Sequence, residues 1–532
     1  MTSLFLILIA VIILLSTFLN NLSSRMGIPT LLAFMLFGMI FANNGLWDIR
    51  FDNYDMAKET CTVALIFIMF YGGFGTRMDA VRPVMGEATL LASVGVILTA
   101  GLVGLFCRLV LGWEWLESML FGSVISSTDA ASVFSILRGK RLGLKNNTAP
   151  MLEMESGSND PASYMLTVIF LSVMNGTASG GTIVWNIFAQ LVFGAGCGFG
   201  IAKLAAMSLK KIKFQTDGFD SLFIFAVAIA SYAIPSLIGG NGYLSAYIVG
   251  ILLGNEEFRG KKSLVSFFDG VTGLMQVLIF FLLGLLARPT MLHKAILPAL
   301  AIFVFLTFVA RPATVFGLLA PFRKYPVKQL AFISFVGLRG AASIVFAIMA
   351  MVNPAFLQHD IFNIVFCLVL ISIGVQGSLI PWAARKMDMV DEDEDVMKTF
   401  NDFSDGTDLD FGRITIAADS SWADKPVKEL NLPKNLLLVL VIRGEERIRP
   451  RGNTVLCAGD EVIVLVREFN DSSIALEERR VKHGSDLAGK RISELPDKGL
   501  IVVVQRGDEN IIPHGNTVLE EGDRLVSVIM HK

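Results

Sequence analysis

The chain has 532 residues, of which 53% are hydrophobic and only 17% charged, and its formal net charge is −2 at pH 7. This composition is too apolar for a soluble protein of that size and indicates many membrane-spanning helices. The charge and the lack of a basic aromatic patch give no indication of nucleic-acid binding. The five cysteines are scattered without a CxxC or Cys/His cluster, so neither a zinc site nor a disulfide framework is supported.

Apolar segments predict the fold class of residues 1–387, an all-α polytopic membrane domain with about 20 residues per helix. Thirteen helices are expected, near 3–20, 28–43, 60–75, 88–111, 115–137, 150–174, 182–208, 221–238, 242–254, 264–287, 293–320, 328–352 and 361–384. The first lacks the basic start and the small-residue cleavage site of a signal peptide, so we interpret it as a helix.

The distribution of Lys and Arg predicts the orientation of this domain. These residues are far more frequent in the loops after odd-numbered helices than in the loops after even-numbered ones. Because positively charged loops stay in the cytoplasm, we expect the N-terminus outside and the C-terminal tail inside. The sequence therefore predicts a multi-pass protein of the cell inner (plasma) membrane.

Two of the predicted helices contain polar interruptions. The first is Ser126–Ser132 (SSTDAAS), and the second is Gly337–Ser343 (GLRGAAS), seven helices later. An offset of seven helices reverses the direction through the membrane, as an inverted repeat with two broken, crossing helices requires. Asp129 would then offset the positive N-terminal ends of the half-helices, and Arg339 the negative C-terminal ends. Close packing of glycines between helices is the alternative interpretation.

A third polar segment, Met151–Val168, has the length of a membrane helix but contains three carboxylates. These are Glu153, Glu155 and Asp160. At helical spacing Glu155 faces Asn159, and Ser156 faces Asp160. A charged side chain at the bilayer centre costs about 2.5–3.5 kcal/mol, so it persists where it faces a partner or a water-filled path. The segment predicts a proton and cation site, and an ion pair that only locks helices together is the alternative.

Arg311 lies within another apolar segment, FLTFVARPATVFG, and needs a carboxylate partner there. The intramembrane candidates are Glu153, Glu155, Asp129 and Asp160.

After Lys386 the composition becomes that of a soluble α+β tail. Residues 388–411 are strongly acidic and predict a solvated linker. Two modules follow, 412–468 and 484–532, in which glycine, proline, threonine and aspartate positions recur at an offset of 63. Each alternates short β-rich runs with glycine turns. No GxGxxG follows a strand, so a nicotinamide-binding half is not expected.

The membrane motifs together resemble one family. Glu155–Pro161 (ESGSNDP), SSTDAAS, the ARP around Arg311 and GLRGAAS are similar to monovalent cation/proton antiporters of the NhaP and sodium/proton exchanger type. The tandem tail resembles the RCK C-terminal (TrkA-C) domain of potassium channels and potassium/proton antiporters. The resemblance implies thirteen helices, an inverted repeat, a homodimer and an exchange activity rather than an enzyme.

The resemblance also assigns roles at the ion site. Asp160 would bind a monovalent cation and a proton in turn, with Ser156 and the Thr128 backbone as further ligands. Asn in place of Asp at position 159 goes with electroneutral one-for-one exchange in this family. Burial disfavours a charged carboxylate and a bound cation favours it, so the two ligands compete for one site.

The remaining assignments concern charges beside the site. Glu155 would pair with Arg311 and be held partly by Asn159. Asp129 would lie at the crossing of the broken helices.

In the tail, the facing turns at Arg449, Arg451, Pro513 and His514 combine cationic groups with backbone N–H donors, which suit an anionic ligand. The resemblance suggests a regulatory nucleotide, cyclic di-AMP first. The alternative is a purely structural dimerisation domain.

Two other functions are alternatives to antiport. A ligand-gated potassium channel would need a carbonyl filter such as TVGYG, and none occurs. An intramembrane aspartic protease built on Asp129 and Asp160 would need a GxGD-type segment, which is also missing. Antiport of potassium is favoured over sodium only because the tail belongs mainly to potassium systems.

Overall fold

The computed structural model divides the chain into two compact units, Met1–Ser404 and Asp405–Lys532. It describes residues 10–18, 29–42, 51–140, 142–212, 218–256, 258, 261–353, 357–391, 409–417, 420, 422–430, 432, 436–444, 446–467, 474–481, 487–495, 500–506, 509–511, 513 and 515–530.

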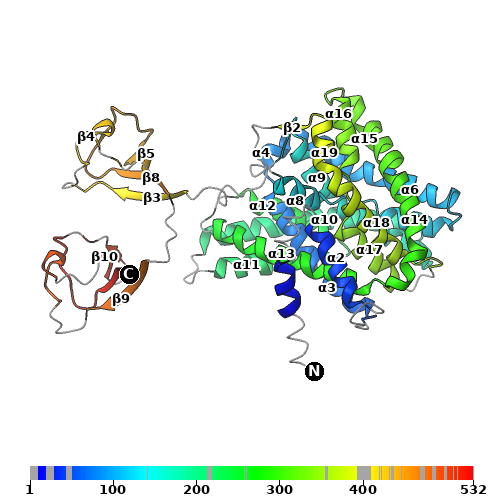
Figure 1. Cartoon of the computed structure of the whole chain (residues 1–532), viewed down its shortest axis with the longest axis horizontal. Helices are drawn as coiled ribbons and strands as arrows, with labels where there is room; N and C mark the ends of the chain where they lie inside the picture. Colours follow the sequence, from blue (N-terminus) through cyan, green and yellow to red (C-terminus); the bar gives the residue numbers. More distant parts are fainter. Residues whose placement is uncertain are drawn as a thin grey trace. The chain divides into compact units, whose positions relative to one another are not determined.

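The first unit is a bundle of helices (Figure 1). Residues 10–18 are helical. The principal helices that follow are α2 (Thr30–Phe41), α3 (Tyr54–Gly75), α4 (Met78–Val81), α5 (Met85–Leu90), α6 (Val96–Leu109), α7 (Trp115–Val124), α8 (Ala130–Gly139), α9 (Thr148–Met174), α10 (Gly180–Lys211), α11 (Phe219–Leu237), α12 (Gly242–Gly254), α13 (Lys261–Leu286), α14 (Leu292–Phe305), α15 (Arg311–Leu319), α16 (Val327–Phe335), α17 (Ala341–Val352), α18 (Ile361–Ile371) and α19 (Ser378–Lys386).

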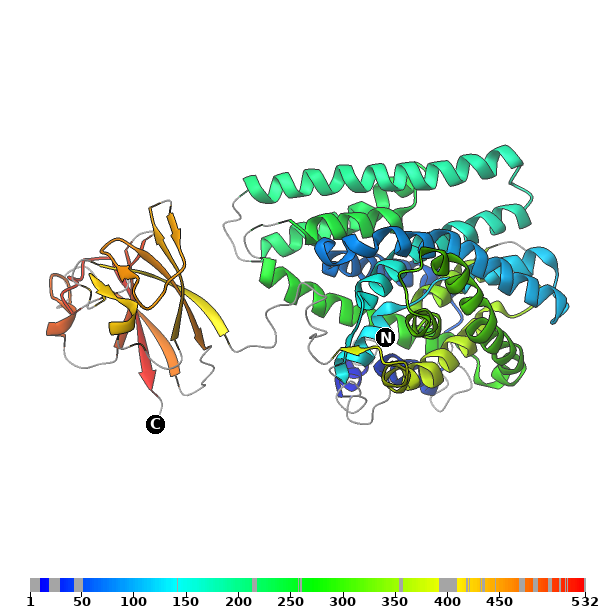
Figure 2. The same cartoon turned by 90° about the horizontal axis from the view of Figure 1, so that it is seen from above.

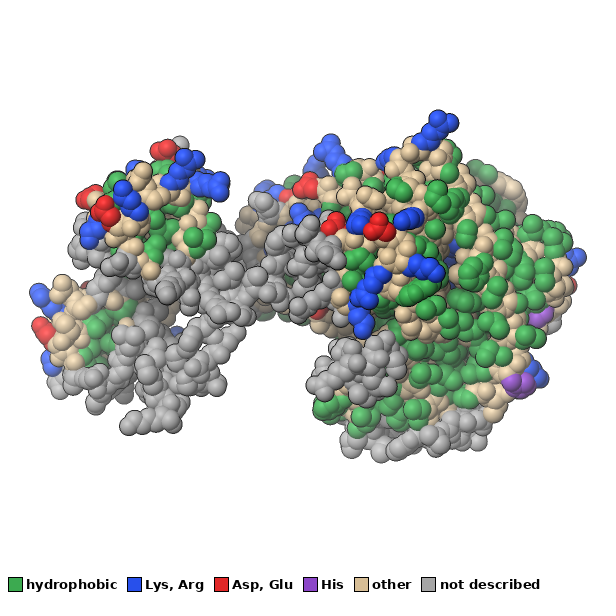
Figure 3. Space-filling view, turned by 45° about the horizontal axis from the view of Figure 1, so that its top comes forward, with side chains coloured by type: hydrophobic (Ala, Val, Ile, Leu, Met, Phe, Trp, Pro, Cys, Tyr) green, Lys and Arg blue, Asp and Glu red, His purple; other side chains and the backbone are tan. Residues whose placement is uncertain are grey.

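Seven helical runs of the described chain are long and apolar enough to cross a membrane. Three of them continue through a π-helical turn, at Leu91–Gly95, Leu306–Ala310 and Ser372–Gly377. Many hydrophobic side chains cover the face of the bundle seen in Figure 3, and α10 lies along one edge of the bundle (Figure 2). The outward side chains of α10, such as Trp185 and Phe188, are about half exposed, as expected for a surface that contacts lipid.

Both polar interruptions are breaks in helices. The chain is non-helical from Ser126 to Asp129, between α7 and α8, and from Gly337 to Gly340, between α16 and α17. The two breaks touch, because the Asp129 N–H donates to the Leu338 carbonyl at 2.9 Å. The third polar segment, in contrast, belongs to one unbroken helix, α9.

The second unit contains two four-stranded antiparallel sheets of the same strand order. The first is β3-β8-β5-β6 and the second is β9-β12-β10-β11. The bounds are β3 (Leu409–Thr415), β5 (Leu436–Arg443), β6 (Glu446–Ile448), β8 (Glu461–Arg467), β9 (Ile474–Arg480), β10 (Leu500–Arg506), β11 (Glu509–Ile511) and β12 (Arg524–Met530). A short pair, β4 (Lys425–Pro426) with β7 (Val455–Leu456), accompanies the first sheet.

Both sheets extend ahead of the predicted module boundaries. The edge strands β3 and β9 begin at Leu409 and Ile474, before residues 412 and 484. The charged residues of β9 concealed its strand pattern. Each module also contains a 3-10 turn, at Val427–Glu429 in the first and Ile492–Glu494 in the second.

The start of the predicted acidic linker also belongs to the first unit. Strand β2 (Val390–Asp391) pairs antiparallel with β1 (Gly143–Leu144), in the connection between α8 and α9. The rest of the linker, 392–408, lies outside the described residues.

Candidate ion-binding site

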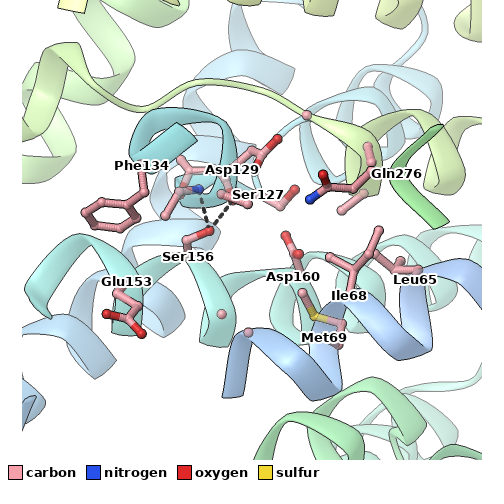
Figure 4. Close-up of a pocket in the computed structure, with 18 of the residues that line it drawn as sticks. Leu65, Ile68, Met69, Ser127, Asp129, Phe134, Glu153, Ser156, Asp160 and Gln276 are labelled. Atoms are coloured by element: carbon pink, nitrogen blue, oxygen red, sulfur yellow. Dashed lines mark hydrogen bonds between the residues drawn. The ribbon is translucent and has the colours of Figure 1, made fainter. Parts of the chain in front are cut away.

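Asp160 lies on α9 beside the two breaks. Its side chain is buried, with 6% of the residue exposed. Its Oδ1 has no hydrogen-bond partner among the described residues. Figure 4 shows the carboxylate directed toward Ser127 and Gln276. A buried carboxylate oxygen without a donor is costly unless a proton or a cation satisfies it.

Two neighbours of Asp160 on α9 hold the first break. The Ser156 hydroxyl donates to the Thr128 carbonyl and accepts from the Ala130 N–H, both at 2.8 Å. The Asn159 amide donates to Thr128 Oγ1 at 2.5 Å and accepts from the Thr128 N–H at 3.2 Å. Ser156, Asn159 and Thr128 therefore form one hydrogen-bonded group around the non-helical backbone, one turn or less from Asp160.

Asp129 and Arg339 satisfy the ends of the broken helices. Asp129 accepts from the Ser132 N–H at 3.1 Å and from the Ser132 hydroxyl at 2.5 Å, so it caps the N-terminus of α8. Arg339 is fully buried and donates to the Ser127 carbonyl, which follows the C-terminus of α7. Gly340 is required here, since a Cβ at this position would lie 2.0 Å from Asp129 Oδ2.

Glu155 lies opposite Arg311. Arg311 Nη1 donates to Glu155 Oε1 at 2.7 Å, and their side chains are 4% and 1% exposed. Glu155 Oε2 and Arg311 Nε have no hydrogen-bond partner among the described residues. The pair is therefore buried but incompletely hydrogen-bonded.

A cavity of about 100 Å³ lies beside Asp160 and is also lined by Glu153, Gly157 and Tyr247. Pro161 has no N–H, so the Gly157 carbonyl lacks the donor that an α-helix would supply. A side chain at Gly157 would clash with Tyr247, whose ring lies 2.3 Å from the position of such a Cβ. Sequence reasoning missed this carbonyl, although a proline four residues after a glycine signals it.

A second cavity, of about 720 Å³, shares Gly72 and Gln276 with the first. Asp269 and Tyr71 line it, and their side chains are 3.4 Å apart. Thr272, one turn further along α13, is buried, and its hydroxyl has no partner among the described residues. Sequence reasoning did not single out Asp269, because one acid near the end of an apolar segment resembles a surface charge.

In the second unit, the predicted ligand residues Arg449 and Arg451 are exposed, and the Arg451 N–H donates to Thr454 Oγ1 at 2.8 Å. Pro513 is half-buried, and His514 lies outside the described residues.

The structure pairs two other charges in the first module. Arg443 Nε and Nη2 donate to both carboxylate oxygens of Asp460, at 2.8 and 2.7 Å. These hydrogen bonds hold the pKa of Asp460 below its usual value. Arg506 and Asp523 repeat the arrangement in the second module, with the same effect on the pKa of Asp523.

The helices of membrane length, the two touching breaks and the buried carboxylate beside them define a membrane-embedded antiporter. The family model for the transmembrane sodium/hydrogen exchanger matches residues 7–386, and the TrkA-C domain matches 411–468 and 476–527. The chain belongs to the sodium/hydrogen exchanger family, which confirms the resemblance read from its motifs.

Individual relatives agree with this assignment. The "K(+)/H(+) antiporter NhaP" of Alkalimonas amylolytica is 34% identical over 463 residues, which cover 86% of this chain and 80% of that protein. The "K(+)/H(+) antiporter NhaP2" of Shewanella sp. (strain MR-4) is 32% identical, over 85% and 79%. The fold resembles the solved sodium proton antiporter MjNhaP1 of Methanocaldococcus jannaschii, with a TM-score of 0.62 and 22% identity over 71% of this chain and 97% of that one.

Proposed function

We propose that the chain exchanges potassium ions for protons, with Asp160 as the group that binds each in turn. The main support is the buried Asp160 carboxylate beside a cavity, because one of its oxygens has no donor among the described residues. Ser156, Thr128 and the Gly157 carbonyl supply further oxygens near it. Potassium is chosen over sodium because the relatives above are named potassium/proton antiporters.

The exchange follows from competition at one carboxylate. A proton neutralises Asp160, and so does a monovalent cation, which makes both loaded states compatible with the low-dielectric surroundings. The empty, charged site is not compatible with these surroundings. The protein therefore switches the side of the membrane from which the site is accessible only with a proton or a cation bound. The ion would enter through the larger cavity, past Asp269 and Gln276.

The wider architecture is proposed as thirteen membrane helices in an inverted repeat, assembled as a homodimer in the plasma membrane. Its N-terminus would be outside and its tail in the cytoplasm, as the loop charges predict. The two breaks that meet at Asp129 and Leu338 support the inverted repeat.

The decisive experiment uses proteoliposomes with an imposed potassium gradient and a pH-sensitive dye inside. The parent chain should move protons, and Asp160→Asn should fold and insert but move none. Ser158→Ala, a change at a half-buried position on the same helix, is the matched control and should retain exchange. Normal exchange by Asp160→Asn would refute the assignment. A sodium gradient in parallel decides the ion.

Electroneutrality is tested in the same vesicles. With one titrating carboxylate at the site and Asn159 beside it, the loaded site has the same charge with either ligand. A membrane potential of 100 mV is worth about 2.3 kcal/mol per net charge moved. The steady rate should therefore not respond to that potential, and a clear dependence would exclude one-for-one exchange.

The tail is proposed as a regulatory module that binds an anionic nucleotide at Arg449 and Arg451, with cyclic di-AMP as the first candidate. Calorimetry on the full chain, with Arg449→Ala/Arg451→Ala as the control, tests this. Absence of binding by the parent chain would leave the structural role.

A further inference from the structure

The segment Met387–Asp391, here called the strap, is bound to the connection that precedes α9. Gly143 and Leu144 pair with Asp391 and Val390 in a two-residue antiparallel ladder. The ladder is extended by the Lys145 N–H, which donates to the Met389 carbonyl at 2.9 Å. An ion pair of 2.8 Å joins Lys145 Nζ to Asp388 Oδ1. The strap is thus held by both backbone and side chains.

Packing adds to these hydrogen bonds. Met389 is 2% exposed, and its hydrophobic cluster includes Leu142, Leu144 and Met151. A short surface connection rarely buries a side chain this completely. The strap is therefore part of the core around the first turn of α9.

The connection bound by the strap leads directly into α9. The Lys145 carbonyl accepts from the Thr148 hydroxyl at 2.7 Å, and Thr148 is the first residue of the helix. Gln329, on α16, donates to Thr148 Oγ1 at 3.0 Å and to the Asn146 carbonyl at 3.1 Å. The start of α9 is thereby joined on one side to the strap and on the other to the helix that enters the second break.

We propose that the strap positions α9 and so sets the geometry of the ion site, with Lys145 and Asp388 as positioning residues. Asp160 is twelve residues after Thr148, about 18 Å along a stiff helix. A change of tilt at the first turn therefore displaces Asp160 relative to Ser127 and Thr128. The functional readout of this inference rests on the exchange activity proposed above.

The test exchanges the charges of the ion pair in the full chain. Lys145→Glu and Asp388→Lys each place like charges together, and the double variant restores an opposite pair. Arg385→Glu, at an exposed position on α19, is the matched control for a charge reversal nearby. Each variant is measured for the cation concentration at half-maximal exchange, for the maximal rate, and for amide hydrogen exchange of the peptide covering residues 142–148.

Each single variant should raise the half-maximal cation concentration about three-fold or more, as expected when an attractive pair becomes repulsive, while the maximal rate changes less. Amide exchange in 142–148 should become faster. The double variant and Arg385→Glu should both resemble the parent. A purely structural role would lower the amount of folded protein without changing the half-maximal concentration.

Two results would overturn the inference. One is a parent-like half-maximal cation concentration in both single variants, whether or not the amount of folded protein falls. The other is a double variant that remains as impaired as the singles. If the parent chain itself moves no protons, the proposed function fails, and the amide measurement then decides alone whether the pair holds the start of α9.

Discussion

Each unit of the molecule contains an arginine–carboxylate ion pair, and the two pairs differ in their hydrogen bonds and burial. Arg443 and Asp460 in the first module form two hydrogen bonds, the Cys457 N–H adds a third at 2.8 Å, and the Arg443 side chain is 41% exposed. Arg311 and Glu155 form one hydrogen bond, are almost fully buried, and leave one polar atom each without a partner in the described chain.

The difference indicates different purposes. In the module pair both carboxylate oxygens of Asp460 accept hydrogen bonds, and these stabilise the turn that contains Cys457. A buried pair with unsatisfied atoms often stabilises less than a hydrophobic pair would, because desolvation offsets the attraction. We therefore propose that the Glu155–Arg311 pair serves transport rather than stability.

The largest effect is expected for Arg311→Ala, which leaves Glu155 buried and uncompensated at a cost of about 3–5 kcal/mol. Thermal unfolding in detergent should occur at a lower temperature, and exchange should be lost. Glu155→Met/Arg311→Met should recover much of the stability but not the exchange. Arg82→Ala, at an exposed position, is the control. Recovery of exchange by the double Met variant would remove the transport role.

A smaller effect is expected for Asp460→Ala, which removes a charged hydrogen-bond acceptor and leaves the Cys457 N–H unsatisfied. The loss should be about 1.5–3 kcal/mol of local stability in the first module. Hydrogen exchange of residues 436–467 measures it, with Arg447→Ala, at an exposed position on β6, as control. Cation/proton transport by this variant should persist. Equal protection in both variants would show that the pair does not stabilise the turn.

The pairs formed by Asp460 and Asp523 predict that the stability of the two modules depends on pH. Because the pKa values of Asp460 and Asp523 are lower in the folded state, their stabilisation is present above the value of an unperturbed Asp, about 3.9. It is lost as the pH falls through the lower folded values. Amide protection of both modules, corrected for intrinsic exchange, should therefore decrease below about pH 4. Asp460→Asn/Asp523→Asn should show a flatter response over that range.

The smallest effect is expected for Asp269→Asn, where a carboxylate faces a cavity rather than an arginine. An exposed charge attracts a cation by about 1 kcal/mol at 4 Å in water. The half-maximal cation concentration should rise by about two- to five-fold with an unchanged maximal rate, and salt should weaken the effect. Asp79→Asn, exposed on α4, should change neither. A lower maximal rate would place Asp269 within the exchange step itself.

Much of the fold of the membrane unit could be predicted from the polar residues within its apolar segments. A charge or a run of Ser and Thr in an apolar segment needs partners, which indicated the breaks, Asp160 and the need for an acid near Arg311. Which acid it was, and that Arg339 donates to a backbone carbonyl, depended on three-dimensional packing. The strap could not be predicted, because it adjoins the strongly acidic linker and its strand partners come from the distant connection between α8 and α9.

In the tail, the repeat predicted two similar modules but not their first strands. The importance of Arg443 was also missed, because an arginine at the end of a strand is usually a surface residue, and its partner lies 17 residues away.

Because both modules lie in one polypeptide, they can diverge separately after duplication. The position that is Cys457 in the first copy is Glu520 in the second, where its carboxylate forms an added ion pair with Arg506 at 2.5 Å. In an assembly of identical chains such a change would appear in every copy at once. Here natural selection can alter one half and preserve the other, so the tail of a single gene product can evolve an asymmetric surface.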